Sequence, residues 1–174
     1  MMLTVNDFEL EVRAGTPDDV PLLLSFIRAM AAFEKLTASA TEESLHSALF
    51  GQDSAAHTLL ASVAGKPIGY ATYFFSFASM MGRRALWLDD LFIDPAYRGR
   101  GIGRALMVYL AAVAVEKQCA RLEWIVLDWN TSAIEFYKRL GANVLPDWRI
   151  CRLEEEQLTR VASGLADEPG GRDV

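Results

Sequence analysis

The sequence predicts an α/β protein with a mixed central sheet and helices on both faces. Three observations lead to this fold class: segments that alternate polar and apolar residues, segments with apolar residues at helical spacing, and an order in which the two kinds interleave. With 174 residues, 52% of them hydrophobic, the chain can bury a substantial core and is too apolar for general disorder. We expect one domain over residues 1–162 and a disordered tail over 163–174, which is rich in glycine, proline and acidic residues.

The N-terminal part of the chain predicts a strand followed by two helices. FELEVRAG (8–15) alternates as a strand does. Thr16-Pro17-Asp18-Asp19 is typical of a helix start, with a hydroxyl cap, proline at the first position and acidic residues in the first turn. Apolar residues then recur at helical spacing as far as Ala31, and Thr41 is expected to open a second helix.

The middle of the chain predicts three strands in succession. HTLLASVA (57–64) and IGYATYFFSF (68–77) flank the turn Gly65-Lys66-Pro67 and indicate a hairpin. RALWLDDLFI (84–93) is a third strand, and Asp94-Pro95 ends it because proline cannot donate to a ladder.

The C-terminal part predicts two more helices and two more strands. A long helix is expected from 101 to about 118, followed by a buried strand, ARLEWIVLD (120–128). TSAIEFYKRLGA (131–142) predicts a short helix with Gly141 in the C-cap role. WRICRLE (148–154) predicts a last strand, with a short acidic helix after it.

Charge and composition exclude several classes of partner. The net charge is −6, from 23 acidic and 17 basic residues, so we expect no nucleic-acid partner. No apolar run approaches the ~20 residues of a membrane span, and the N-terminus has no secretory pattern. Cys119 and Cys151 lack metal-ligand spacing. We therefore expect a reduced, cytoplasmic protein without a membrane or metal partner.

The stretch YRGRGIGRALM (97–107) places three glycines directly after a predicted strand and at the start of a predicted helix. The dinucleotide fingerprint G-x-G-x-x-G fails because the glycines fall at every second position, and the P-loop fails because Arg104 follows Gly103. A plain strand-to-helix turn is the simplest interpretation of the glycine count. The placement favours a diphosphate cradle, since orphan N–H groups and the helix dipole attract an anion there.

Arg98-Gly99-Arg100-Gly101-Ile102-Gly103 matches the R-x-x-G-x-G signature of the GNAT N-acetyltransferase superfamily, whose members bind acetyl-coenzyme A. Three longer segments resemble its diamine (spermidine/spermine) and thialysine branch: FIRAMAAFEKLT, WLDDLFIDPAYRGRGIG and LDWNTSAIEFYKRLGA. The resemblance covers roughly residues 8–153. It implies a GNAT-type, mostly antiparallel central sheet, acetyl-CoA as co-substrate, and a homodimer.

The resemblance also implies a set of coenzyme contacts. Backbone groups of Leu91, Phe92 and Ile93 would align the pantetheine arm and polarise the acetyl carbonyl. The diphosphate would bind at the glycine turn, which comprises Arg98, Gly99, Arg100, Gly101, Ile102, Gly103 and Arg104. Contacts farther along the coenzyme would come from Asn130, Thr131, Ser132 and Ala133.

Acetyl transfer from a thioester to an amine requires a deprotonated amine, a stabilised carbonyl oxygen and a proton for the departing thiolate. By resemblance, Tyr137 contacts the coenzyme and is the general acid that supplies this proton. A phenol has a pKa of about 10 and can donate at pH 7. Spacing alone favours a core tyrosine, because Tyr137 shares an apolar helical stripe with Ala133, Phe136 and Leu140.

A cationic amine calls for an acidic site. By resemblance, Glu34 contacts a polyamine, while Asp89 binds the substrate and, through a water, accepts its proton. Strict alternation would put Asp89 and Asp90 on opposite strand faces, so Asp90 is expected to be structural. Ordinary surface charges are the simpler interpretation, although an Asp-Asp pair in an apolar strand is costly. Further substrate-contacting positions are implied at Phe33, Glu123, Trp124, Ile125, Asp147 and Trp148; Trp148 is also compatible with a core position.

The segment FSFASMMGRR (75–84) departs from the diamine branch, which carries an acidic residue there. A long polycation needs several carboxylates, so the sequence favours a short amine, either a small diamine or a lysine-like amino acid such as thialysine. Two alternatives stay open. The protein could acetylate a protein N-terminus or lysine, or it could be a non-catalytic acyl-CoA-binding module.

Overall fold

The computed structural model describes residues 1–5 and 8–164, and they fall into two units, one of residues 1–130 and one from residue 131 onward. Most of the expected disordered tail, from residue 165 on, lies outside the described residues. The first unit contains the sheet and three α-helices, and the second contains two α-helices.

A single sheet in the first unit runs in the order β1-β2-β3-β4-β5-β6. All neighbouring strands are antiparallel except β5 and β6, which are parallel. The mixed, mostly antiparallel sheet confirms the predicted fold class; the short N-terminal strand β1 was not predicted. The strands are β1 (Met2–Val5), β2 (Phe8–Ala14), β3 (His57–Val63), β4 (Lys66–Ala78), β5 (Arg83–Ile93) and β6 (Leu122–Glu123).

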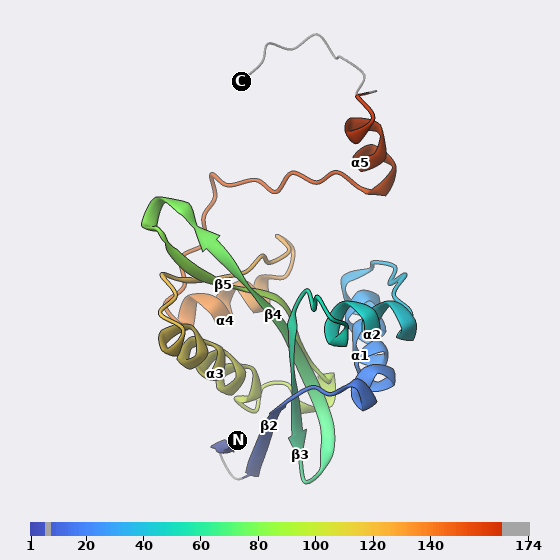
Figure 1. The fold of residues 1–174 in the computed structure, drawn as a ribbon. Helices are drawn as coiled ribbons and strands as arrows, with labels where there is room; N and C mark the ends of the chain where they lie inside the picture. The colour runs from blue at the N-terminus through green and yellow to red at the C-terminus, as the bar shows by residue number, and fades with distance from the viewer. Residues whose placement is uncertain (6–7, 165–174) are drawn as a thin grey trace. The chain divides into compact units, whose positions relative to one another are not determined.

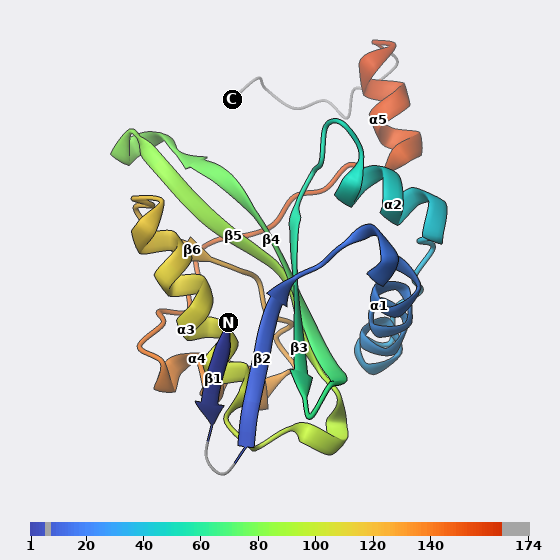
Figure 2. The ribbon, with the colours of Figure 1, turned by 60° about the horizontal axis from the view of Figure 1, so that its bottom comes forward.

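Helices cover both faces of this sheet (Figures 1 and 2). The helices α1 (Val20–Glu34) and α2 (Glu42–Phe50) lie on one face, and α3 (Ile102–Glu116) lies on the other. The apolar stripes that predicted α1 and α3 supply buried side chains, which include Leu23 and Leu24 of α1 and Leu106 and Leu110 of α3. In the described part of the chain, no helix is long and apolar enough to cross a membrane.

The start of α1 is anchored by an ion pair that the sequence did not indicate. Both nitrogens of the Arg13 guanidinium lie 2.7 Å from the oxygens of the Asp19 carboxylate. The Thr16 backbone N–H and hydroxyl also donate to Asp19, so the threonine donates to the acid in this capping arrangement. The hydrogen bonds from Arg13 hold the pKa of Asp19 well below its usual range, against the opposing effect of burial.

Replacing Asp19 with asparagine is expected to lower the free energy of unfolding by about 1–3 kcal/mol at pH 7. The folded-state pKa of Asp19 lies below its unfolded value of about 3.9. The pair therefore stabilises the fold above that pH, and the stabilisation is lost as the pH falls through the folded-state pKa. Urea denaturation at pH 7 and pH 3 measures this, and a difference from wild type of the same size at both pH values would contradict it.

The second unit contains α4 (Thr131–Arg139) and α5 (Glu155–Ala162), both as predicted. Gly141 has a φ of 89°, and its N–H donates to the Lys138 carbonyl at 2.9 Å, which confirms its C-cap role. The strand predicted over 148–154 is wrong, since these residues form neither strand nor helix. Trp148 is 79% exposed, so its core interpretation is also wrong. Alternation shows only that a segment is able to form a strand; the strand itself requires an available sheet edge.

The strand predicted over 120–128 is also much shorter than expected. Only Leu122 and Glu123 form β6, and the chain from Trp124 to Asn130 is irregular. An apolar run therefore indicates that a segment can be buried. It does not determine how many of its residues pair with a neighbouring strand.

Candidate active site

The edge of β5 that faces β6 is largely unpaired. β6 pairs with β5 at only two positions, Leu86 with Leu122 and Trp87 with Glu123. Beyond Trp87, β5 continues to Ile93 with a ladder to β4 alone. Within the described residues, the backbone groups of this end of β5 that face away from β4 thus have no strand partner. Such an edge can hydrogen bond to an extended molecule that carries amide groups.

The predicted pantetheine contacts lie at this unpaired end of β5. Leu91 is half-buried, while Phe92 and Ile93 are buried. The Ile93 carbonyl oxygen accepts a hydrogen bond from Arg98 Nε at 3.0 Å. The guanidinium of Arg98 therefore ties the glycine turn to the end of β5.

The glycine turn continues from β5 into α3 through two residues with left-handed backbone. Gly99 has a φ of 74° and Gly101, the N-cap of α3, a φ of 88°. Other residues rarely adopt these angles, which accounts for both glycines. No side chain caps α3, so the N–H groups of its first turn, from Ile102 to Arg104, are oriented toward solvent or a ligand. This arrangement fits an anion such as a diphosphate, and the exposed Arg104 adds positive charge.

A half-buried carboxyl, that of Asp90, lies near the same end of β5. Tyr70 Oη and Thr72 Oγ1, both on β4, each donate to Asp90 Oδ2 at 3.1 Å. Burial raises the pKa of Asp90 above its usual range, and the nearby charge of Asp89 raises it further, although both hydrogen bonds oppose this shift. The same burial raises the pKa of Tyr70. Tyr70 and Thr72 were not predicted, because nothing in the sequence indicates which β4 residues lie opposite Asp90.

Asp89 is the extra residue of a β-bulge. Thr72 pairs with Asp90 and Tyr73 pairs with Leu88, so Asp89 has no partner on β4. The expectation that the two aspartates point to opposite faces assumed regular alternation, which the bulge interrupts. The pair differs in environment instead: Asp89 is exposed, while Asp90 is half-buried and hydrogen bonded.

Glu34 completes a cluster of three carboxylates with Asp89 and Asp90. It is the last residue of α1, and partial burial raises its pKa. Its charge in turn raises the pKa of Asp90 and of Tyr70, which places it within electrostatic reach of β4 and β5. Three acids gathered without a basic ion-pair partner among the described residues form a favourable site for a cation.

Cationic side chains lie on aromatic rings at the end of α1 and of β5. The Arg98 guanidinium lies 4.5 Å from the Phe33 ring centroid and 5.8 Å from that of Phe92. Phe33 also packs against Trp129, with ring centroids 5.9 Å apart, and Lys35 Nζ lies 5.9 Å from the Trp129 centroid. The structure thus brings together the predicted residues Phe33 and Arg98 with Lys35 and Trp129, to which the sequence analysis assigned no site role.

The remaining predicted residues of the first unit are arranged differently. The Glu123 carboxylate forms an ion pair with Arg121 at 2.8 Å, so its negative charge is paired within the protein. Ile125 is 49% exposed, and the Asn130 N–H donates to the Leu127 carbonyl at 2.8 Å.

Within the second unit, Tyr137 is half-buried on α4, and its ring lies 5.1 Å from that of Phe136. Its carbonyl accepts hydrogen bonds from Leu140 and Ala142 in the C-terminal turn of the helix. Asp147 and Trp148 are exposed in the irregular segment after α4. The other predicted residues of this unit form the first turn of α4: Thr131, Ser132 and Ala133.

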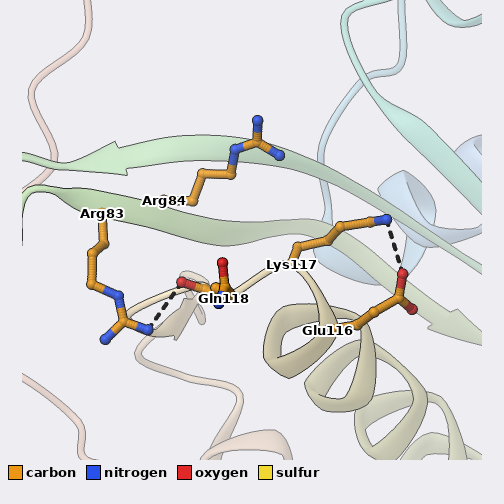
Figure 3. Close-up of a pocket in the computed structure, with 5 residues that line it drawn as sticks. All are labelled: Arg83, Arg84, Glu116, Lys117 and Gln118. Carbon is orange, nitrogen blue, oxygen red and sulfur yellow. Dashed lines mark hydrogen bonds and ion pairs between the residues drawn. The ribbon is translucent and has the colours of Figure 1, made fainter.

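A separate polar depression lies at the other end of α3, where Arg83 donates to the Gln118 carbonyl at 3.0 Å and Lys117 pairs with Glu116 at 2.9 Å (Figure 3). The Arg83 guanidinium donates a hydrogen bond to a backbone carbonyl just after the C-terminus of α3, which is a common structural role of arginine. None of the predicted site residues lines this depression.

Known proteins resemble this chain in sequence and in fold. Residues 26–142 match the acetyltransferase (GNAT) family. A thialysine N-epsilon-acetyltransferase from Bos taurus is 35% identical over 164 residues, covering 87% of this chain and 96% of the relative. An L-ornithine N5-acetyltransferase from Arabidopsis thaliana is 29% identical, covering 86% of each chain. A solved integron cassette protein from V. cholerae has a TM-score of 0.73 at 28% identity, covering 88% of this chain and 97% of that one.

The fold, the site and these relatives together define an enzyme that transfers acetyl groups. The chain belongs to the GNAT family of acetyltransferases, and it is similar to the branch that includes the thialysine enzymes.

Proposed function

We propose that this enzyme transfers an acetyl group from acetyl-CoA directly to a primary amine of a small cationic acceptor, in a ternary complex. The observation that supports this most is the proximity of the carboxylate cluster (Glu34, Asp89 and Asp90) to the unpaired end of β5. The names of the relatives, which act on thialysine and on L-ornithine, agree with an acceptor of this kind.

Each part of the site has a defined task in this proposal. The glycine turn binds the diphosphate, and the unpaired edge of β5 binds the pantetheine arm through backbone groups that have no strand partner in the described part of the chain. The carboxylate cluster binds the ammonium group of the acceptor. The cysteine pattern favours the cytoplasm as the setting of this reaction, and the family resemblance implies a homodimer.

The chemistry then requires Asp89 and Tyr137 to transfer one proton each. An alkylammonium has a pKa of about 10.4, so Asp89, through a water, takes a proton to expose the nitrogen lone pair. The nitrogen attacks the acetyl carbonyl, the carbon–sulfur bond breaks, and Tyr137 donates its phenolic proton to the departing thiolate. The acetylated nitrogen releases its second proton to solvent, and solvent reprotonates the Tyr137 phenolate. The products are the N-acetyl amine and free coenzyme A.

Purified protein is expected to release free thiol from acetyl-CoA only when a primary amine is present. A panel of diamines, polyamines and basic amino acids tests this, with mass spectrometry of the acetylated product and an N-terminally free peptide as a competing acceptor. We expect turnover with short amines and weaker turnover with spermine. Tight acetyl-CoA binding without turnover would favour a binding module, and turnover confined to the peptide would favour a protein acetyltransferase.

A further inference from the structure

Lys35 occupies a position that normally belongs to glycine. It follows the last residue of α1 and has left-handed backbone, with φ 61° and ψ 33°. Its N–H donates to the carbonyl of Ala32 at 3.3 Å, and the Leu36 N–H donates to Ala31 at 2.8 Å, so the helix ends in a regular left-handed cap. A residue with a Cβ is strained there, and strained positions that persist tend to be those where the side chain has a task.

The Lys35 side chain lies against an aromatic pair at the end of α1. Its ammonium lies 5.9 Å from the Trp129 ring centroid, and Trp129 contacts Phe33, whose ring is covered by the Arg98 guanidinium at 4.5 Å. Phe33 and Lys35 flank Glu34 in the chain. Throughout the described residues, Lys35 forms no ion pair with a carboxylate.

Residues at the end of α1 and on β5 thus carry charges of both signs. Glu34 ends α1 and Asp89 and Asp90 lie on β5, whereas Lys35 and Arg98 supply positive charge on the faces of Trp129 and Phe33. An acceptor with an ammonium at each end would bring one of them toward Lys35 and Arg98, and like charges repel. An acceptor with an amine at one end and a carboxylate at the other matches charges of both signs.

We propose that Lys35 binds the carboxylate of the acceptor and thereby selects amino acids that carry a side-chain amine over the corresponding diamines. This inference rests on the proposed function, since it concerns the acceptor of the same site. Lys35 acts as a specificity determinant: it touches the far end of the acceptor and takes no part in proton transfer. The Lys35 ammonium is held against the aromatic face of Trp129, and its N–H groups stay available to donate hydrogen bonds to the carboxylate of the acceptor.

The test uses acceptors that differ only by a carboxylate: lysine against 1,5-diaminopentane, and ornithine against 1,4-diaminobutane. Wild-type enzyme is expected to show the higher kcat/KM with the amino acid of each pair. In Lys35→Gly we expect KM for the amino acids to rise about two- to fivefold with kcat unchanged, because one ion pair made equally in the ground and transition states is lost. The values for the diamines should stay the same or improve.

Three controls separate specificity from folding. Lys35→Gly relieves the left-handed strain, so its melting temperature should equal or exceed that of wild type. Lys35→Arg keeps the charge and should keep the preference for amino acids. Lys66→Gln removes a comparable ammonium, 5.5 Å from the Tyr97 ring centroid, and should leave the preference unchanged.

The possible failures are distinguishable. If no amine is acetylated, the proposed function fails. If amines are acetylated but wild type prefers the diamine of each pair, or Lys35→Gly retains the wild-type preference, the role of Lys35 is overturned while the proposed function stands.

Discussion

Replacing Tyr137 with phenylalanine is expected to lower kcat by about 10²–10⁴-fold, because the departing thiolate loses its proton donor. The affinity for acetyl-CoA should be unchanged, since phenylalanine retains the ring that lies 5.1 Å from Phe136 on α4. Steady-state turnover at saturating acceptor, together with calorimetric titration of acetyl-CoA, measures the two quantities separately. The loss should lessen with an activated thioester whose thiolate is a weaker base and needs no proton.

A second tyrosine provides the control. Tyr73 on β4 is also half-buried, and its ring packs against His57 and Phe75. Tyr73→Phe removes a hydroxyl of the same kind from a residue without a proposed catalytic role, so its kcat should match that of wild type. Unaltered turnover in Tyr137→Phe would remove the general-acid role and favour the core-tyrosine interpretation.

Replacing Gly101 with valine is expected to weaken acetyl-CoA binding at least tenfold. Gly101 caps α3 with a φ of 88°, which a β-branched residue adopts only under strain. The backbone at residue 101 must therefore move, which shifts the N–H groups of the first turn of α3 away from the diphosphate. Each hydrogen bond to a charged group contributes about 1.5–3 kcal/mol, so losing one accounts for about a 10- to 100-fold effect.

The matched control is Gly65→Val. Gly65 has a φ of 74° in the turn between β3 and β4, and a Cβ there would meet no atom within 4 Å. Both variants should lose stability by about 1–3 kcal/mol from backbone strain, as thermal denaturation would show. Only Gly101→Val should lose acetyl-CoA affinity. Equal affinity in the two variants would mean that the glycine turn does not bind the coenzyme.

Patterns that are local in the chain were sufficient to predict most elements. The apolar stripe that buries Leu106 and Leu110 predicted α3, and the glycine in the C-cap of α4 predicted where that helix ends. Turn residues predicted the β3–β4 hairpin in the same way. These features depend on neighbours within a few residues, so a single sequence contains them.

The acidic cluster could be predicted only in part. Glu34 and Asp89 were proposed from resemblance, whereas the hydrogen-bonded environment of Asp90 depends on which β4 residues lie opposite it. That register is set by a bulge, and a one-residue shift would have placed other side chains against Asp90. Lys35 was overlooked because a lysine after a helix is usually solvated, and its left-handed backbone has no signature in the sequence.

The sequence alone determined the fold class, the helices and the glycine turn, because helical periodicity and glycine placement are properties of neighbouring residues. The tertiary structure decided how short β6 is, that residues 148–154 form no strand, and which cations lie on which aromatic rings near the end of α1. Strand pairing and charge clustering join residues far apart in the chain. They follow from the packing of α1 against the sheet and from the register of β4 on β5.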